Sequence, residues 1–411
     1  MTVFSELRMR PATASGWNAS TTARLVISGA VIFALLVGAN LATPLYPLLQ
    51  ASLGLSALDV TAAFASYVLA LVATLMLAGH WSDHIGRRAA LLLAVLGGLA
   101  GNLVFAEAHT LAGLCAGRAL QGIAVALATG ASAAALRELL PSRPEWASRF
   151  TLLASSGGVA AGPAIGGLLS LLPGATTAPY GVHSVVLAGL LVPLFLIRAR
   201  PAIALPAVSR PLQALAPRRP AVSRNARGAF WLASGVGFLS FAVFGFSLSL
   251  APGYFARVLE TDSRPLIGVL AGLPLAASAF SQLLTVRGRL VVPAGLAVLG
   301  ASVVLLGTAG AHSPLLLVAA CVAAGMGQGL AFRTVFNDVA GKVEAARHAQ
   351  VISTVYVITY LGSAVPVLGL GWASGMVGQP AAVLGFVVVC GAAALVLAGL
   401  TLARALRGRH S

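Results

Sequence analysis

Arg118 is the basic residue whose position most suggests chemistry, because it lies well inside a long apolar run. A charge within such a run is costly and normally faces a cavity or a partner, which makes Arg118 a functional candidate. Gln121 and Gly122 follow at i+3 and i+4, so on a helix they share its face. A side chain that extends to the outer lipid headgroups is the structural alternative.

The ten residues 79–88 form a charged break between two apolar runs. Two glycines, one acid and two arginines fall in it: Gly79, Asp83, Gly86, Arg87 and Arg88. Glycines permit a bend and arginines favour the cytoplasmic side, so the segment is typical of a turn between two membrane helices. Asp83 and Arg87 are one helical turn apart, and Glu138 ends a later apolar run on the same side. We interpret Arg88 as a topology residue, and solvated loop charge is the alternative for all of them.

Small residues recur at helical spacing between residues 158 and 167. Gly158, Gly162 and Gly166 form one bare stripe on which a partner helix can pack backbone to backbone. Pro163 removes a helical hydrogen bond, and Gly167 extends the small-residue run. A second stripe lies later in the chain, and we expect it to meet the first: Gly268, Gly272 and Ala276. Generic glycine packing is the alternative, because the chain has 46 glycines.

Other polar and aromatic residues are sparse in the apolar runs. Those that we expect to line a cavity together with Arg118 and Gln121 are Asn40, Tyr46, Gln328, Tyr356 and Tyr360. Three phenylalanines recur at helical spacing in the same half of the chain as the last three: Phe238, Phe241 and Phe244. A mostly apolar cavity with few hydrogen-bonding groups suits lipophilic solutes. Packing or lipid contact is the alternative for the aromatic stripe.

Acids and histidines lie at the ends of the apolar runs or in loops, which leaves Asp59 and Glu107 as candidate proton sites. The runs contain no paired carboxylates, no Ser/His pair and no metal-ligand spacing, so we expect neither an enzyme nor a metal or cofactor site. Cys115, Cys321 and Cys390 all fall in apolar runs, and we expect no disulfide.

The elements that must position these residues are membrane helices. Hydrophobic residues make up 58% of the 411, charged residues make up 9%, and the mean hydropathy is +0.94. A soluble fold cannot bury so much apolar surface, and a membrane span needs about 20 apolar residues. Twelve spans can be drawn, near residues 25–47, 58–80, 89–106, 110–136, 149–172, 178–197, 229–254, 265–285, 290–310, 313–333, 349–371 and 379–403. We therefore predict an all-α polytopic membrane protein.

Nearly all of the 26 basic residues fall on one side of these spans, which the positive-inside rule identifies as cytoplasmic. We expect both termini there, in the tails 1–24 and 404–411. The net charge of +16 thus orients the chain in the bilayer, and no nucleic-acid partner is expected. A proline- and arginine-rich stretch, 198–228, divides the spans six and six. The pattern predicts two six-helix bundles, 25–197 and 229–403, joined by a cytoplasmic linker.

The two halves share weak internal similarity in the same order. Gln121 aligns with Gln328, and at nearly the same offset Pro44 aligns with Pro252. Such order is expected of a duplicated unit whose substrate site lies at the repeat interface, near the middle of the membrane. The two predicted bundles are therefore pseudo-symmetric.

Three of these patterns resemble signatures of the major facilitator superfamily of transporters. The turn at 79–88 resembles its loop between helices 2 and 3. The R-x-x-Q-G pattern that begins at Arg118 is similar to a signature of its fourth helix. The G-x-x-x-G-P-x-x-G-G pattern at 158–167 resembles the antiporter signature of its twelve-span drug:proton antiporter group.

The resemblance implies a secondary active transporter that works by alternating access between the two bundles. It implies that Arg118 takes part in proton coupling and that Asp83, Arg87 and Glu138 form a charge cluster latching one conformation. With the apolar cavity it favours proton-coupled efflux of a small lipophilic or amphipathic compound. The alternative is uptake of a small organic solute, by symport or facilitated diffusion. The expected partners are the substrate, protons and the lipid bilayer, and we expect a monomer in the bacterial cytoplasmic (inner) membrane.

Overall fold

The structure, a computed structural model of the chain, describes residues 17–78, 81–198, 224–284, 286–308, 313–344 and 348–407. Within these ranges the chain is helical, apart from turns and one isolated β-bridge between Trp17 and Ile197. Twelve helices of the described ranges are long and apolar enough to cross a membrane. The prediction of an all-α protein with twelve spans is confirmed.

The first bundle contains six spans. Its first span joins three consecutive helices, α2 (Thr21–Asn40), the short 3-10 helix η1 (Thr43–Leu45) and α3 (Tyr46–Leu53). The others are α4 (Ala57–Ala78), α6 (Arg87–Ala106), α7 (Leu111–Leu139), α8 (Pro144–Leu169) and α9 (Ala178–Leu196), with the short α5 (Trp81–Ile85) between α4 and α6. Ser20 and Thr110 explain where α2 and α7 begin, because each side chain accepts a hydrogen bond from the first turn of its helix.

The second bundle has the same organisation. Its helices are α11 (Arg224–Ser249), the short α12 (Ala251–Val258), α13 (Arg264–Leu283), α14 (Val291–Thr308), α15 (Pro314–Lys342), α16 (His348–Val377) and α17 (Gln379–Arg407). In both bundles the first long helix breaks near its end, and a short helix with a proline in its first turn follows, at Pro44 and Pro252. Proline lacks an N–H and is tolerated at the start of a helix, so it fixes the break at the same place in each half.

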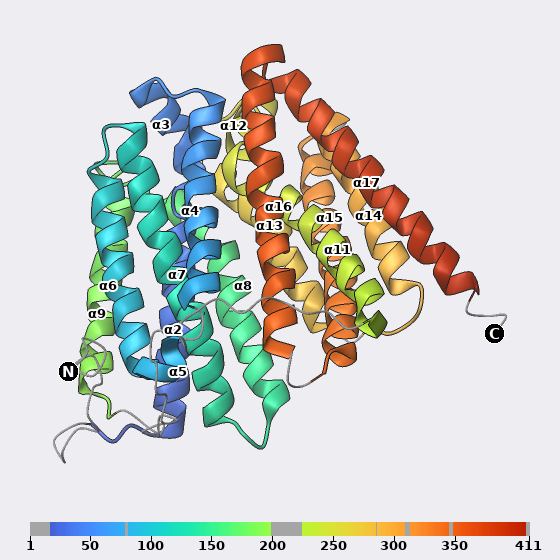
Figure 1. Ribbon diagram of the computed structural model, residues 1–411. Coiled ribbons are helices and arrows are strands. Elements are labelled where there is room, and N and C mark those ends of the chain that lie inside the picture. Colours follow the sequence, from blue (N-terminus) through green and yellow to red (C-terminus); the bar gives the residue numbers. More distant parts are fainter. Residues whose placement is uncertain are drawn as a thin grey trace.

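The two ends of the molecule differ in charge. We call the end at which α2, α6, α8 and α11 begin the arginine-rich face, because most arginines of the described loops and helix ends lie there. The other end, which carries α3 and α12, is called the opposite face. In Figure 1 the arginine-rich face is at the bottom and the opposite face at the top.

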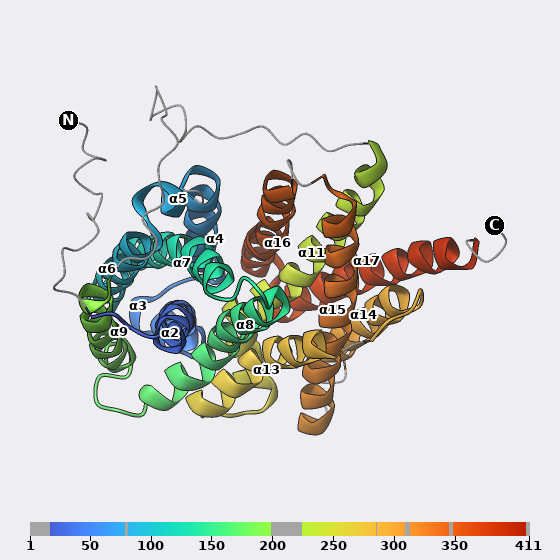
Figure 2. The ribbon, with the colours of Figure 1, turned by 90° about the horizontal axis from the view of Figure 1, so that it is seen from below.

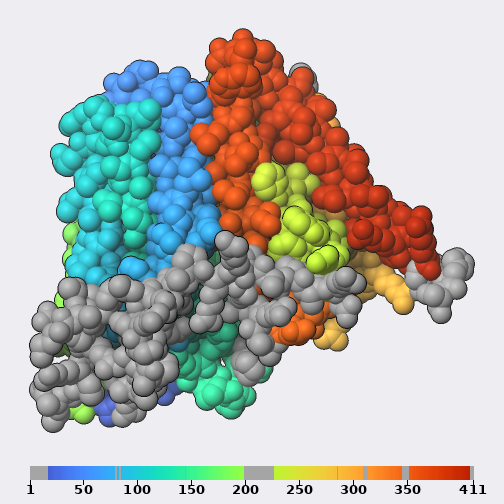
Figure 3. Space-filling model, in the orientation of Figure 1, coloured from blue at the N-terminus to red at the C-terminus, as the bar shows by residue number. Residues whose placement is uncertain are grey.

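The bundles meet through two helix pairs, α8 with α13 and α4 with α16 (Figure 2). A Cβ at Gly167 would collide with the backbone of Arg264, and one at Gly268 would collide with the backbone of α8. In the other pair, Gly371 of α16 lies against the backbone of Leu58 in α4. All of these contacts lie toward the opposite face, so the bundles touch backbone to backbone there. Figure 3 shows α4 and α16 side by side on one surface of the molecule.

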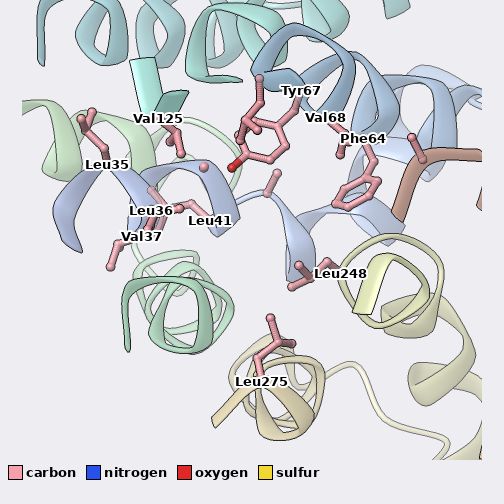
Figure 4. Packing of buried hydrophobic residues seen from close by; sticks show 14 of the residues in the cluster. Leu35, Leu36, Val37, Leu41, Phe64, Tyr67, Val68, Val125, Leu248 and Leu275 are labelled. Atoms are coloured by element: carbon pink, nitrogen blue, oxygen red, sulfur yellow. The ribbon is translucent and has the colours of Figure 1, made fainter. Parts of the chain in front are cut away.

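Buried apolar side chains from both bundles form one cluster around α2 (Figure 4). Leu36 and Leu41 come from the first span and Tyr67 from α4, while Leu248 and Leu275 come from the second bundle. From about its midpoint onward α2 is buried on nearly all sides. The first span is therefore an inner helix, and the polar residues that face it are shielded from lipid.

Candidate functional site

Arg118 lies on α7 with its guanidinium inside the first bundle, and the residue is only 1% exposed. Its Nη1 donates to the Ala39 carbonyl oxygen of α2 and to Gln121 Oε1 at 2.9 Å. The guanidinium also lies over the Tyr67 ring, 4.5 Å from its centroid, and 6.0 Å from that of Phe64. The alternative of a side chain extended to the headgroups is wrong, because these contacts hold Arg118 against α2 and α4.

A chain of side-chain hydrogen bonds continues from Gln121 across the first bundle. Gln121 Nε2 donates to Asn102 Oδ1 of α6 at 3.4 Å, and Asn102 Nδ2 lies 2.8 Å from His183 Nδ1 of α9. His183 Nε2 ends the chain 2.8 Å from the Ala34 carbonyl oxygen of α2. Four spans are thereby linked through polar groups inside an apolar bundle.

The position of His183 corrects the sequence interpretation, which placed every histidine at a span end or in a loop. Asn102 is a buried polar residue that the sequence interpretation did not consider. His183 is 5% exposed and lies six residues into α9, where its ring occupies the space that a side chain at Gly38 would need. Asn102 is likewise buried, near the end of α6. Both His183 and Asn102 could have been noticed as polar residues inside apolar runs. Their contact could not, because it depends on how α6 and α9 pack.

The two candidate proton sites predicted from the sequence, Asp59 and Glu107, lie outside the buried polar chain. Asp59 Oδ2 accepts hydrogen bonds from the backbone N–H and the hydroxyl of Ser56, at 2.8 and 2.7 Å, and the Ser56 hydroxyl accepts one from the Asp59 N–H. This reciprocal arrangement caps the start of α4. Glu107 is exposed just after α6. Neither carboxylate reaches the buried polar chain.

Asn40 and Tyr46 of the first span have different surroundings. Asn40 Nδ2 donates to the Leu36 carbonyl oxygen at 2.8 Å, one turn back on its own helix, and its Cβ faces Gly162 of α8. Tyr46 is 2% exposed, and its hydroxyl has no hydrogen-bond partner in the described part of the chain. The same holds for the hydroxyl of Tyr180 and for Nε of Arg118. Tyr46 therefore belongs with Arg118, whereas Asn40 packs between α2 and α8.

Gln328 of α15 occupies in the second bundle the place that Gln121 has in the first. It is buried, and Ser278 Oγ of α13 donates to its Oε1. Gln282 Nε2 in turn donates to Ser278 Oγ at 3.1 Å. The predicted alignment of Gln121 with Gln328 thus corresponds to two similar buried amides, each hydrogen-bonded within its own bundle.

Tyr356 and Tyr360 belong to an aromatic cluster of the second bundle. The ring of Tyr360 meets Phe241 of α11 edge-on at 5.3 Å between centroids, and Tyr356 lies 5.1 Å from Phe336 of α15. Phe332 connects the two pairs, 6.3 Å from Phe241 and 5.6 Å from Phe336. Tyr356 is 37% exposed, and Tyr360 is half-buried. The cluster extends from the middle of α16 toward the arginine-rich face.

The aromatic cluster of the second bundle faces the Arg118 region of the first. Tyr67, the ring over which Arg118 lies, belongs to α4, and α4 packs against α16, which carries Tyr360. The pair α4 and α16 therefore connects the surroundings of the buried cation with the helix that carries part of the aromatic cluster. Phe244 extends the cluster, 6.0 Å from Phe241, while the backbone of Phe238 packs against Gly362.

The turn between α4 and α6 is held by an ion pair. Arg87 donates through Nε and Nη2 to Glu138 Oε1, at 3.1 and 2.8 Å, and through Nη1 to Ser82 Oγ at 2.6 Å. The pair ties the start of α6 to the end of α7, so freely solvated charge is the wrong description of these two residues. Gly86 has φ +91°, which glycine adopts readily. Gly79 and the side chain of Asp83 lie outside the residues that the structure describes.

Arg88 does more than mark topology. Its Nε donates to the Leu194 carbonyl oxygen at 2.6 Å, and its Nη2 donates to that of Phe195. These are among the last carbonyls of α9, which lack helical partners. Arg88 therefore joins the start of α6 to the end of α9, a contact that adjacency in the sequence does not suggest.

The glycine stripe of α8 packs on α2, which corrects the expected partner. A Cβ at Gly158 would lie 2.6 Å from the Phe33 carbonyl oxygen, one at Gly162 would lie 2.9 Å from that of Val37, and one at Gly166 would collide with Leu41. The contact of α8 with α13 uses a neighbouring face. There Gly268 lies against the Pro163 carbonyl and Gly272 against that of Ala160, Gly167 meets the start of α13, and Ala276 is exposed. The helix pair was predicted, but the face of α8 was wrong because both faces are rich in small residues.

Twelve membrane-length helices in two bundles, with a buried cation in the first and an aromatic cluster in the second, form the fold of a membrane transporter. The sequence profile of the Major Facilitator Superfamily matches residues 28–366, and the chain belongs to that family. Its membership agrees with the three signatures that the sequence carries.

Two curated relatives are multidrug or antibiotic resistance proteins. The chain is 39% identical over 113 residues to the class E tetracycline resistance protein of Escherichia coli, covering 26% of this chain and 27% of that protein. It is 34% identical over 125 residues to the putative multidrug resistance protein MdtD of Cronobacter sakazakii, covering 30% of this chain and 26% of that protein. The matches thus span about a quarter of each relative.

Solved structures share the fold. A bacterial homologue of the human lysosomal transporter Spinster, in an inward-facing and unoccupied conformation, superposes with a TM-score of 0.74 at 14% identity, over 93% of this chain and 95% of that one. The human organic anion transporter MFSD10 gives a TM-score of 0.66 at 18% identity, over 93% and 100%. At these identities the likeness is one of fold alone.

Proposed function

We propose that the protein exports a small lipophilic or amphipathic compound in exchange for protons, by alternating access between the bundle α2–α9 and the bundle α11–α17. The observation that carries this proposal is Arg118, a buried cation held against α2 and α4 whose described neighbours are neutral groups and aromatic rings. A buried charge compensated only by neutral groups responds strongly to any proton or ligand charge that arrives nearby. The partial similarity to tetracycline and multidrug resistance proteins supports export.

The proposed orientation places the arginine-rich face in the cytoplasm, in a bacterial inner membrane. The tails 1–24 and 404–411 and the linker 198–228 would then be cytoplasmic, and 25–197 and 229–403 would be the two moving units. Because the bundles touch at the opposite face, the described conformation would be closed to the outside. The aromatic cluster would then be reached from the cytoplasm, as an exporter requires.

The aromatic cluster supports a lipophilic substrate. Rings from α11, α15 and α16 offer apolar faces and few hydrogen-bonding groups, of which the hydroxyls of Tyr356 and Tyr360 are two. A flat apolar compound can stack on such rings and still place one polar group near Arg118. Sugars and other solutes with many hydroxyls would leave most of their hydrogen bonds unmade there.

The charge cluster of the turn completes the proposal. The Arg87–Glu138 pair, together with Asp83, would hold the turn in the shape needed to latch the arginine-rich face when that face closes. In the described conformation the ion pair lies within the first bundle, between α6 and α7. We propose that this ion pair holds the turn in position before the arginine-rich face closes, so that the turn can contact the second bundle when it does.

Accumulation of tetracycline and ethidium in bacteria that produce the protein tests the direction and the coupling. Export predicts less dye or drug in producing cells than in cells with Arg118→Met, and the difference should vanish when a protonophore collapses the gradient. Symport predicts greater accumulation that the protonophore reduces, and facilitated diffusion predicts faster entry that it leaves unchanged. Equal accumulation in both strains for both probes would contradict the choice of substrate class.

A further inference from the structure

The buried polar chain has two ends whose hydrogen-bonding roles cannot change. At one end the Arg118 guanidinium can only donate, and at the other the Ala34 carbonyl can only accept. Between them lie two side-chain amides, Gln121 and Asn102, and the imidazole of His183. Because each amide has one accepting and one donating side, the fixed ends determine how every group between them is turned.

The order of donors follows step by step from Arg118. Gln121 must present Oε1 to the guanidinium, so its Nε2 faces Asn102, which must accept with Oδ1. The Asn102 Nδ2 then faces His183 Nδ1, which must accept with its lone pair. At the other end, His183 Nε2 must carry the hydrogen that the Ala34 carbonyl accepts. His183 is therefore neutral in this arrangement, with its proton on Nε2.

A second proton on His183 is incompatible with this order. An imidazolium donates from both nitrogens, so Nδ1–H needs an acceptor, and Asn102 can supply one only by turning its oxygen toward the ring. Its Nδ2 then faces Gln121, which must turn its own oxygen toward Asn102 and its Nε2 toward Arg118. Two donors then face each other, and Arg118 loses Gln121 while keeping Ala39. The Ser184 hydroxyl, 3.3 Å from Asn102 Nδ2, can donate or accept and does not oppose the reversal.

The charged residues within the helices that pack against α9 lie near the arginine-rich face, at the other end of the bundle from His183. On α2 the charged residue is Arg24, in its first turn, and α6 begins with Arg87 and Arg88. On α8, Glu145 and Arg149 lie in its first two turns, all at the arginine-rich face. Toward the ring these helices present backbone, Gly38 and Asn102.

The titratable or charged groups of the first bundle toward the opposite face, where His183 lies, are Arg118, Cys115, three tyrosines, and, at the helix ends, the exposed Glu107 and His109 and the half-buried Asp59. Tyr180 lies one turn earlier on α9, and Tyr46 and Tyr67 lie beside Arg118. Among them, Arg118 is the charged group that the two amides join to His183 by hydrogen bonds, whereas the Asp59 and Glu107 side chains lie at the helix ends. A change at the His183 imidazole can therefore reach the Arg118 guanidinium through the hydrogen bonds of Asn102 and Gln121.

We propose that His183 binds the proton exchanged during transport, and that Asn102 and Gln121 transmit its protonation to Arg118 by reversing their side-chain amides. The proposal rests on the proton coupling proposed above. The proton adds to the lone pair of Nδ1 and later leaves the same nitrogen, and no other covalent bond changes. Protonation would release Arg118 from Gln121 while it still lies over Tyr67 of α4, the helix that packs against α16 of the second bundle.

Nitrogen-15 NMR of the full chain in lipid bilayers tests the relay without any substrate. His183 signals are assigned by their loss in His183→Gln, and His109→Gln, a change at an exposed loop histidine, is the matched control. In the wild type we expect the imidazole to change from the Nε2–H form to the doubly protonated form as the pH of the sample is lowered from about 8 to about 4. The Arg118 guanidinium signals should change with the same midpoint.

The variant Asn102→Leu then distinguishes transmission through the two amides from a direct effect of the His183 charge on Arg118. In this variant the Arg118 signals should no longer follow His183, because the amides cannot reverse in turn. A His183 ring that stays neutral throughout the pH range would overturn the proposal, and so would an Arg118 response that persists unchanged in Asn102→Leu.

Ethidium transport in proteoliposomes gives the functional counterpart. His183→Gln should lose transport driven by a pH gradient and retain exchange of ethidium for ethidium, which needs no net proton movement. Gradient-driven transport that survives in His183→Gln refutes the assignment of His183 while leaving the proposed export intact. If the wild-type protein shows no gradient-driven transport, proton coupling itself fails, and the NMR comparison still decides whether the relay exists.

Discussion

Gly268 is the position at which one added methyl group should distinguish the two conformations of the proposed alternating-access cycle. It lies where α13 crosses α8, and a Cβ there would collide with the Pro163 carbonyl oxygen and lie 2.8 Å from its carbon. The obstacle is helix backbone, which cannot rotate away as a side chain can. This contact joins the two bundles at the opposite face, so it exists only while that face is closed.

The magnitude follows from the cost of overpacking. Forcing an extra carbon into a well-packed contact costs about 1–3 kcal/mol. Since the open state does not contain the contact, this cost enters the difference between the two states directly. The ratio of closed to open opposite face should therefore fall by roughly 5- to 150-fold in Gly268→Ala.

Distances between spin labels at Ser52 and Asp262 would report the change. Both residues are exposed at the opposite face, one in each bundle. The three cysteines, Cys115, Cys321 and Cys390, are first replaced by alanine. We expect the wild type to give mainly short distances and Gly268→Ala to add a population at longer distances. Transport should also slow, because the return to the closed opposite face becomes the unfavourable step.

Two matched glycines provide controls. A Cβ at Gly369 of α16 would meet nothing within 4 Å, so Gly369→Ala should leave the distances unchanged. Gly162 faces α2 inside the first bundle, so Gly162→Ala should lower the thermal midpoint of unfolding without changing the ratio of the two states. Equal distance distributions in Gly268→Ala and Gly369→Ala would refute the reasoning, since the collision would then have no conformational consequence.

Three further changes test other parts of the site. Arg118→Met should abolish gradient-driven transport while the thermal midpoint stays the same or rises, because a buried charge whose described neighbours are all uncharged is replaced by an apolar chain of similar length; a large drop in the midpoint would show that Arg118 is structural. Glu138→Gln should cost about 1 kcal/mol or less in stability, because its side chain is 34% exposed, but should slow transport; normal rates would remove the turn from the mechanism. Tyr360→Ala should weaken ethidium binding, measured by fluorescence titration, with the exposed Trp231→Ala as control; equal losses in both would point to nonspecific adsorption.

Span number, span order and family could be predicted from the sequence because each depends on local composition. An apolar run of sufficient length is a membrane helix wherever it folds, and arginines orient it whatever its neighbours are. The break after α2 is a similar case, since Pro44 acts on the residues next to it. Arg118 was recognisable because a charge in an apolar run is costly in any arrangement.

Which residues meet Arg118 depended on the tertiary structure. His183 and Asn102 are 81 residues apart, and Arg88 reaches carbonyls more than 100 residues away, so no local pattern joins them. The glycines of α8 also show that sequence spacing does not identify which helix a given face contacts. Spacing predicts that a helix packs there, but two of its faces are equally bare, and only the arrangement of the bundle decides that one contacts α2 and the other α13. Apolar runs are specified residue by residue, whereas a buried polar chain exists only once four helices have packed together.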